Sequence, residues 1–495
     1  MFNPPGRSQS INFLAFLSAA CLLPCGIASA APSITLSKKT GPPTSRILVS
    51  GRGFAPNASV DIYFDTKEEA VATANSTGAF SQIAIPAPAS ALTGDHWVSA
   101  VERSGDGATQ ARFDVQRNWR QFHRLNMQRM NPFENVLNVN NVGRLRLKWS
   151  FDTGFEVASS PAVANGVVYI ASLDGSVYAL NAKTGAKLWS HDTDRYVDSD
   201  PAVANGVVYV GCDDAVCSLN ARTGKLLWRY GAGGHVPSPT VANGVVYVGS
   251  AGYKAYALDA ITGALLWSYQ TGGEFYSSPA VANGAVYVGS DGGNVYALDA
   301  STGALLWSYT TGGAVSSSPA VANGAVYVGS DDGNLYALDA STGAKVWSFT
   351  TGGDVYSSPA VANGVVYIGA VDFNVYALNA STGAKLWSHN TGGYVTSSPA
   401  LANGVVYVGS DDHYVYALNA SNGALLWSYA TGFYVESSPA VANGVVYVAS
   451  YDHSVYAFGL PDSDGAKQDA ASKRPDPKTL RPDLSVKPSK LVATR

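Results

Sequence analysis

The chain repeats itself at an interval of 39 or 40 residues over most of its length. The clearest marker of each copy is a tryptophan, which recurs at Trp149, Trp189, Trp228, Trp267, Trp307, Trp347, Trp387 and Trp427. A fixed interval of this size is typical of repeat architectures, because each copy forms one supersecondary unit that buries its apolar face against its neighbours. The repeat therefore limits the possible folds more than any other feature of the sequence.

Each copy has the pattern of four short strands. In the copy over residues 272–307, apolar residues alternate with small or polar ones at 285–290 and 295–299, which is the period of a strand. An Asn-Gly pair, such as Asn283-Gly284, separates two of these runs and is typical of a type I′ hairpin turn. Four antiparallel strands in each copy predict the blade of a β-propeller.

The number of copies and the two ends of the repeat predict a closed ring. Ser-Pro-Ala-Val-like segments between residues 160 and 438 indicate eight blades. The last copy ends at 456–458 without its fourth strand, whereas residues 144–149 form such a strand with no blade before it. We expect this early strand to complete the last blade, which would leave no free sheet edge. The sequence thus predicts an all-β fold with an eight-bladed β-propeller over residues 143–460.

A tryptophan-containing motif carries a resemblance to a known family. Ala257-x-Asp259-x-x-Thr262-Gly263-x-x-x-Trp267 resembles the docking motif of the eight-bladed quinoprotein dehydrogenases, which use pyrroloquinoline quinone (PQQ), and of the wider PQQ-like repeat family. Residues 119–122, 131–138 and 142–149 are similar to the segment that leads into that propeller. The resemblance spans residues 117–460 and implies the fold rather than the chemistry.

The N-terminal residues 1–30 have the pattern of a signal peptide. Arg7 precedes an apolar run over 11–23, and Ala28-Ser29-Ala30 offers a cleavage site of small residues. The segment at 22–25, which ends in Cys25, leaves a lipoprotein as the alternative. We therefore expect an exported protein, periplasmic or extracellular, with no transmembrane segment in the mature chain.

Three further segments surround the repeat. Strand-like runs over 32–116 predict a small β-sandwich, and residues 49–60 resemble immunoglobulin-like or IPT/TIG-type modules. Residues 117–142 are expected to form a lead-in strap, and residues 461–495, which are poor in apolar side chains, a disordered tail. The strap carries a basic cluster that we expect to be solvated, with an anion site as the alternative: Arg117, Arg120, His123, Arg124 and Arg129.

Two cysteines remain beyond the signal segment. Cys212 and Cys217 flank one hairpin turn, and in an oxidising compartment they predict a disulfide across that turn. A redox-active or metal-binding role is the alternative. His413 and His453 lie at equivalent turns of successive copies, and such turns diverge from the axis, so we predict no shared metal site.

Variation between copies gathers in the connection from one last strand to the next first strand. If the first strands line the central channel, the varying residues form a rim around one of its ends, together with the turns at 411–414 and 451–453. The candidate binding residues are Glu156, Tyr196, Asp198, His235, Glu274, Tyr276, Asp354, Tyr356, Tyr394, Tyr434 and Glu436. We count Asp200 among the acids of this rim. An acidic, aromatic surface suits a cationic peptide, a sugar or Ca²⁺, and neutral drift of the loops is the alternative.

This sequence lacks residues that the quinoprotein dehydrogenases it resembles use for their activity. Those enzymes use adjacent cysteines, a tryptophan, a Ca²⁺ ion held by Glu and Asn, and a catalytic Asp. This chain has no Cys-Cys pair, and the repeat already uses its propeller tryptophans. We therefore predict a non-enzymatic, monomeric binding or scaffold protein without a cofactor, similar to PQQ-like repeat proteins of bacterial envelopes. A PQQ- and Ca²⁺-dependent oxidoreductase is the alternative.

The partner is expected to be a protein, peptide or glycan. With 14% charged residues and a net charge of −4, the sequence lacks the basic footprint of a nucleic-acid-binding protein.

Overall fold

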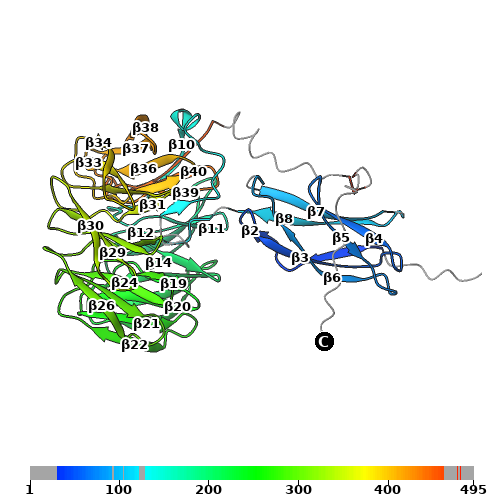
Figure 1. The fold of residues 1–495 in the computed structure, drawn as a ribbon, viewed down its shortest axis with the longest axis horizontal. Coiled ribbons are helices and arrows are strands. Elements are labelled where there is room, and N and C mark those ends of the chain that lie inside the picture. The colour runs from blue at the N-terminus through cyan, green and yellow to red at the C-terminus, as the bar shows by residue number, and fades with distance from the viewer. Residues whose placement is uncertain are drawn as a thin grey trace, which may run out of the picture.

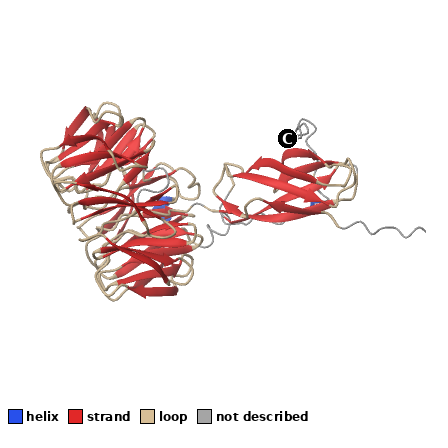
Figure 2. Cartoon of the chain, turned by 90° about the horizontal axis from the view of Figure 1, so that it is seen from below, coloured by secondary structure: helices blue, strands red, loops and turns tan. Residues whose placement is uncertain are grey.

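The structure is a computed structural model that describes residues 31–91, 94–103, 105–116, 118–121, 129–461, 476–477 and 480. Its regular elements are strands, apart from the short 3-10 helix η1 (Val142–Arg144), so the all-β prediction is confirmed. Figures 1 and 2 show two groups of strands, a smaller N-terminal unit and a larger β-propeller. The predicted signal peptide at 1–30, and almost all of the predicted tail at 461–495, lie outside the described residues.

The repeat over residues 280–310 shows how each copy folds. It forms one antiparallel sheet from β23 (Ala280–Ala282), β24 (Ala285–Ser290), β25 (Asn294–Asp299) and β26 (Leu305–Thr310). Asn283 and Gly284 join the first two strands with φ values of 52° and 80°. Both angles are positive, as the predicted type I′ turn requires.

The other copies form sheets of the same kind. Those before this copy are β11 (Ala162–Ala164), β12 (Val167–Ala171), β13 (Ser176–Asn181) and β14 (Lys187–Asp192); β15 (Ala202–Ala204), β16 (Val207–Cys212), β17 (Ala215–Asn220) and β18 (Leu226–Gly231); β19 (Thr240–Ala242), β20 (Val245–Ser250), β21 (Lys254–Asp259) and β22 (Leu265–Gln270). Those after it are β27 (Ala320–Ala322), β28 (Ala325–Gly329), β29 (Asn334–Asp339) and β30 (Lys345–Thr350); β31 (Ala360–Ala362), β32 (Val365–Gly369), β33 (Asn374–Asn379) and β34 (Lys385–Asn390); β35 (Ala400–Ala402), β36 (Val405–Gly409), β37 (Tyr414–Asn419) and β38 (Leu425–Ala430).

The last sheet combines both ends of the repeat. Its strands β39 (Ala440–Ala442), β40 (Val445–Ala449) and β41 (Ser454–Gly459) are completed by β10 (Arg146–Asp152). Strand β10 pairs antiparallel with β41, with Leu147 opposite Phe458 and Phe151 opposite Val455. The sequence predicted this pairing from the missing last strand. The first strand of each sheet is its inner strand, and each inner strand contacts the inner strands of the two neighbouring sheets. Because β11 contacts both β15 and β39, these contacts form a closed ring.

The repeat tryptophans join each sheet to the next one. The indole N–H of Trp267 donates to the carbonyl of Ala300 in the following sheet (3.0 Å), and the indole lies against Gly303. A Cβ at Gly303 would stand 2.7 Å from the ring, and the φ of this glycine is +73°. A side chain is therefore excluded there by both contact and backbone conformation. The same arrangement holds for six other tryptophans: Trp149, Trp189, Trp228, Trp307, Trp347 and Trp387.

Trp427 differs from the other repeat tryptophans. Its ring meets Phe458 edge-on at 5.0 Å between ring centres and stacks on Tyr429. The reason lies in the sequence, because the last sheet ends at Gly459 without the Thr-Gly turn that receives the indole elsewhere.

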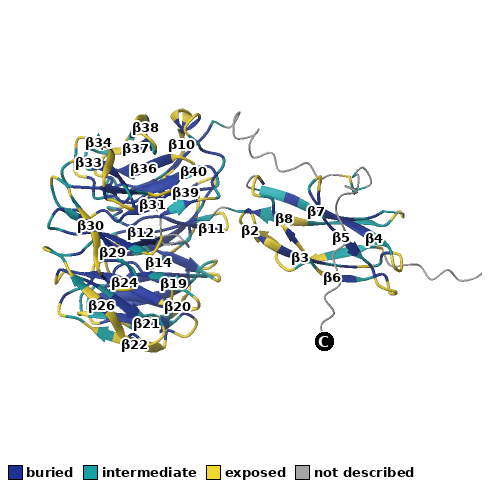
Figure 3. Cartoon of the chain, in the orientation of Figure 1, coloured by how far each residue is buried: buried dark blue, intermediate teal, exposed yellow. Residues whose placement is uncertain are grey.

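The N-terminal unit consists of two sheets around a common core. One sheet has the order β1-β3-β6, and the other β2-β8-β7-β4-β5. Ile47 and Val49 of the first sheet and Ile62, Val98 and Phe113 of the second are fully buried in one apolar cluster, which Figure 3 shows in dark blue. The strands are β1 (Ser33–Leu36), β2 (Thr40–Gly41), β3 (Arg46–Arg52), β4 (Ser59–Phe64), β5 (Lys67–Thr73), β6 (Phe80–Pro86), β7 (Gly94–Glu102) and β8 (Ala108–Val115).

Candidate functional site

The strap (described residues 118–121 and 129–142) contacts the inner strands of several sheets. Trp119 bridges to Val163 of β11, the carbonyl of Arg120 accepts from Val203 of β15, and Gln121 accepts from the backbone N–H of Val241. On the other side of the ring, β9 (Met130–Asn131) runs parallel to β35. The described strap residues also contact Asn-Gly turns, because the side chain of Asn403 donates to the carbonyl of Leu137 and the backbone N–H of Gly444 donates to Glu134.

Arg129 of the strap is buried, which corrects the expectation of a solvated charge. Its side chain has no exposed surface and donates hydrogen bonds to the carbonyls of Pro399 (3.0 Å) and Ser398 (3.2 Å). Burial lowers the pKa of Arg129 to about 9, opposed by the carboxylate of Asp200. Arg120 is partly buried, whereas Arg117, His123 and Arg124 lie outside the described residues. The strap places this arginine against the inner strands, where backbone carbonyls replace water as its partners.

A belt of hydrogen bonds joins the inner strands above the strap. The backbone N–H of one Ser-Pro serine donates to the hydroxyl of its counterpart in the next sheet, as from Ser318 to Ser358 (2.9 Å) and from Ser438 to Ser160 (3.0 Å). Asp200 replaces this serine in one sheet and accepts from the backbone of Ser160. The prediction that Asp200 belongs to the rim is therefore wrong, because its side chain points into the buried belt. Burial raises its pKa to about 6.

The rim lies at the other end of the inner strands. Tyr196 is 75% exposed, and Tyr276, Tyr356, Tyr394 and Tyr434 are also exposed. The hydroxyls of two of these tyrosines donate to acids of their own loops, Tyr276 to Glu274 (2.5 Å) and Tyr356 to Asp354 (2.9 Å). These two loops thus hold their tyrosine side chains by tyrosine–carboxylate hydrogen bonds.

Acids from different sheets influence one another across the rim. Burial raises the pKa of Glu436, and the charge of Glu156 in the neighbouring sheet raises it further. Tyr451, from one of the turns expected on this face, donates to Glu436 (2.9 Å) and is also affected by the charge of Asp198. His235 pairs with Asp198 at 2.8 Å, and this hydrogen bond raises the pKa of His235. These residues therefore form one electrostatic unit.

A second row of acids belongs to the rim: Asp411 lies in the turn at 411–414 that the sequence analysis expected there, whereas Asp331 was not predicted. Burial raises the pKa of Asp331 to about 6 and that of Asp411 to about 7, and nearby acids add to both shifts. Each has a buried oxygen without a hydrogen-bond partner. The following acids, Asp332 and Asp412, instead accept from the tyrosines at 336 and 416. In the sequence, Asp331 and Asp332 are both turn residues, as are Asp411 and Asp412. Only the fold shows that the first acid of each pair belongs to the rim and that the second accepts a structural hydrogen bond.

Aromatic groups fill the outer part of the rim. Phe155 stacks on His453 at 5.7 Å between ring centres, and His413 meets Tyr434 edge-on at 5.3 Å. The two histidines pack against different rings, and the described residues contain no group of three or more His, Cys, Asp or Glu suited to a metal ion. Exposed aromatic residues beyond the predicted set are Phe155, Tyr253, Phe373, Tyr414 and Phe433.

The two cysteines form a disulfide in the hairpin of β16 and β17. Cys212 and Cys217 are buried in the apolar core between two sheets, with their Cα atoms 5.9 Å apart. The two cysteines are five residues apart, so this disulfide differs from the bond between adjacent cysteines that the resemblance to quinoprotein dehydrogenases would imply.

The sheets, docked tryptophans and rim together define a β-propeller of PQQ-like repeats. The chain belongs to the family described as outer membrane protein assembly factor BamB, which matches residues 94–237, 216–318, 292–396 and 371–468. No curated protein matches it in sequence.

Solved structures show the same fold at low sequence identity. BamB from Moraxella catarrhalis is 22% identical with a TM-score of 0.57, covering 64% of this chain and 100% of its own. Quinohemoprotein alcohol dehydrogenase from Comamonas testosteroni is 18% identical with a TM-score of 0.61, covering 70% and 82%. A europium-containing methanol dehydrogenase is 16% identical with a TM-score of 0.58, covering 72% and 94%. Two of these structures are named as dehydrogenases, whereas BamB is not named as an enzyme. The shared fold therefore does not determine the activity.

Within the described part of the chain, no helix has the length and apolar character to cross a bilayer.

Proposed function

We propose that the protein is an exported, non-enzymatic scaffold that binds a partner at the rim of an eight-bladed propeller. The continuous ring of inner-strand contacts supports eight blades. The disulfide supports an oxidising compartment such as the periplasm or the cell exterior. The two-sheet core of the N-terminal unit supports a small β-sandwich of immunoglobulin-like or IPT/TIG type, which would act as a spacer.

The observation that carries this proposal is the contrast between the two ends of the inner strands. The strap contacts inner strands on both sides at one end, whereas the other end presents exposed tyrosines among carboxylates. Function commonly resides in such loops on a rigid scaffold. Acids whose charges already repel one another, such as Glu156 and Glu436, gain from a cation between them. We therefore favour a protein or peptide partner that offers Lys or Arg side chains, which the aromatic rings also suit.

The chemistry of the rim does not fit PQQ. PQQ carries three carboxylates, and Asp411 and Asp331 already have raised pKa values from burial and from nearby acids. Arg195 is paired with Asp213 at 2.9 Å, and the disulfide lies in an apolar core rather than at the rim. An oxidoreductase that uses PQQ and Ca²⁺ remains the second candidate because a quinohemoprotein dehydrogenase shares the fold.

A crosslinking pull-down from bacterial envelope extract tests the scaffold function. The double variant Tyr356→Ala/Glu436→Ala should lose the partner captured by the wild type, because it removes an exposed ring and a rim carboxylate. Ile261→Ala, at an 85% exposed turn away from the rim, is the matched control and should retain the partner. Equal capture by both variants would contradict binding at the rim.

Titration with PQQ and Ca²⁺ tests the second candidate. The scaffold proposal expects no saturable change in tryptophan fluorescence and no dye-linked alcohol oxidation. Saturable quenching together with turnover would establish the oxidoreductase instead.

A further inference from the structure

Basic side chains gather at the outer edge of three consecutive sheets, whose fourth and outermost strands are β10, β14 and β18. Each sheet carries its cations on this strand or on the segment just before it. These residues are all exposed, and we call them the basic strip: Arg144, Arg146, Lys148, Lys183, Lys187, Arg222 and Lys225. At the same positions the other sheets carry only Lys345 and Lys385, so the strip is a local feature of the ring.

The three outer edges are in contact through the repeat tryptophans. The indole N–H of Trp149 in β10 donates to the carbonyl of Ala182 in the turn before β14 (3.0 Å). Trp189 of β14 donates in the same way to Ala221 in the turn before β18 (3.0 Å). These two turns carry cations of the second and third sheets, so the basic residues of the three sheets form one continuous surface.

Asparagine replaces aspartate at the start of both turns. In the sheet of β22 the corresponding turn begins with Asp259, whose carboxylate accepts from the backbone N–H of Thr262 (2.8 Å). Asn181 accepts from the backbone N–H of Thr184 (3.1 Å), and Asn220 does the same in the next turn. The turns of the strip thus keep their hydrogen bonds without a negative charge beside the cations.

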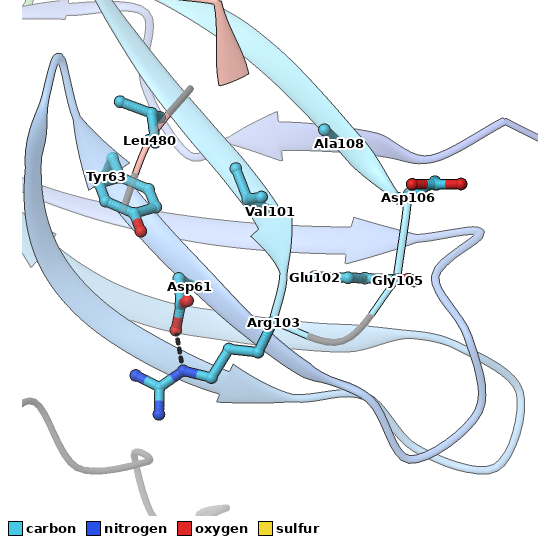
Figure 4. A pocket seen from close by; sticks show the side chains of 10 residues that line it. Asp61, Tyr63, Val101, Glu102, Arg103, Gly105, Asp106, Ala108 and Leu480 are labelled. Atoms are coloured by element: carbon cyan, nitrogen blue, oxygen red, sulfur yellow. Dashed lines mark hydrogen bonds and ion pairs between the residues drawn. The ribbon is translucent and has the colours of Figure 1, made fainter. Parts of the chain in front are cut away.

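Several cations outside the strip are paired with acids. Arg103 of the N-terminal unit donates to Asp61 at 2.6 Å, as the dashed line in Figure 4 shows. Arg229, farther along β18, pairs with Asp214 at 2.8 Å. Among the described residues, three members of the strip have no acid at salt-bridge distance: Lys183, Arg222 and Lys225. Their charges are therefore available to an anionic partner.

Exposed leucines lie between the cations of the strip. Leu188 of β14 is 52% exposed and Leu227 of β18 is 49% exposed, and Leu147 and Leu226 are exposed as well. The same combination binds amphipathic helices to membranes, because apolar side chains enter the boundary of headgroups and acyl chains while cations meet anionic headgroups. A soluble polyanion would use the charges but not the leucines.

We propose that the basic strip binds the surface of a membrane that contains anionic phospholipids. The Lys and Arg side chains contact the headgroup phosphates, and the leucines between them enter the outer part of the acyl layer. The chain as a whole has a net charge of −4, so attraction to an anionic bilayer requires a local cationic surface of this kind. The strip and the rim share no residue, and the inference is independent of the function proposed for the rim.

Co-sedimentation of the purified protein with vesicles tests the proposal. The wild type should bind vesicles of phosphatidylglycerol and phosphatidylcholine but not vesicles of phosphatidylcholine alone, and salt should weaken the binding. The variant Lys183→Ser/Arg222→Ser/Lys225→Ala carries the residues that other copies have at these positions, such as Ser301 and Ala304. It should bind at least about ten-fold more weakly, because each basic residue near an anionic surface strengthens binding about five-fold.

A matched control removes the same charge outside the strip. Lys254→Asn/Lys345→Gln/Lys385→Gln should bind within about two-fold of the wild type, because these lysines lie on separate sheets. Both variants keep the segment 461–495, so its lysines contribute equally to each. Equal weakening of the two variants, or no binding of the wild type to the anionic vesicles, would overturn the proposal.

Leucine variants separate a membrane from a soluble polyanion. Leu188→Ser/Leu227→Ser should weaken vesicle binding about five-fold, because it removes the side chains that enter the bilayer. Leu306→Ser/Leu386→Ser changes equally exposed leucines at the same positions of sheets outside the strip and should have no effect. If the first leucine variant binds vesicles like the wild type, and the strip binds soluble heparin as tightly as vesicles, the surface recognises an acidic polymer and the membrane proposal is wrong.

Discussion

Replacing Asp200 by serine should remove a pH dependence from the stability of the ring. Serine holds the equivalent position in the other inner strands, for example Ser358 and Ser438, so the variant makes the belt uniform. Burial raises the pKa of Asp200 to about 6 from the ordinary 3.8. The folded chain therefore holds this proton more tightly than the unfolded chain does, and the stabilising effect is complete below pH 4.

The magnitude follows from the shift in pKa. Two pKa units correspond to about 3 kcal/mol at about 1.4 kcal/mol per unit. As pH rises from about 4 to above 6, the wild type should lose this amount of unfolding free energy through Asp200. Asp200→Ser should not lose it. The attraction between Arg129 and the ionised carboxylate is already contained in the pKa of Asp200, because the charge of Arg129 is one of the causes of that pKa.

The assay is urea unfolding followed by tryptophan fluorescence at pH 4.5, 5.5, 6.5 and 7.5. Other shifted acids, including Asp331 and Asp411, titrate equally in both proteins, so the difference between the two curves isolates Asp200. Relative to the wild type, the variant should gain about 2 kcal/mol between pH 4.5 and pH 7.5, because the rest of the effect falls below pH 4.5. Ser318→Asp introduces the same carboxylate elsewhere in the belt. Its unfolding free energy relative to the wild type should therefore fall as pH rises, whereas that of Asp200→Ser should rise. A flat difference curve for Asp200→Ser would refute the reasoning.

Two further predictions concern the scaffold. Gly303→Ala should lower the unfolding free energy by about 1–3 kcal/mol more than Gly324→Ala, because both glycines have positive φ but only the first meets an indole; equal urea midpoints would contradict the docking role. Cys212→Ser/Cys217→Ser should cost about 2 kcal/mol or less, because the disulfide closes a short loop, and dithiothreitol should lower the melting temperature of the wild type but not of the variant.

The sequence predicted those parts of the fold that local pattern determines. Strand period, the Asn-Gly turns and the missing last strand led to the sheets and to the pairing of β10 with β41. Comparison between copies also identified exposed rim residues such as Tyr356, because these positions vary from copy to copy while the surrounding scaffold positions stay the same. The displaced ring of Trp427 was missed, although the absent Thr-Gly turn was visible.

Positions that depend on contacts between distant segments could not be predicted in this way. Arg129 and Asp200 look like ordinary surface charges in the sequence, and their burial depends on how the strap enters the ring. The raised pKa values of Asp331 and Asp411 could not be predicted either, because their turns resemble any acidic β-turn.

The pairing of β10 with β41 has a consequence for how the protein is made. During synthesis β10 emerges before any of the repeats, but its partner is among the last strands to appear. Until then its backbone groups face solvent, and the sheets between them can fold one after another from local contacts. Only the arrival of residues 454–459 allows the terminal sheet to form. If translation stalls before this point, the incomplete propeller has two sheet edges with unpaired backbone N–H and C=O groups. Such edges can pair with other chains, so the nascent chain is protected against aggregation only when the final strand pairs with β10.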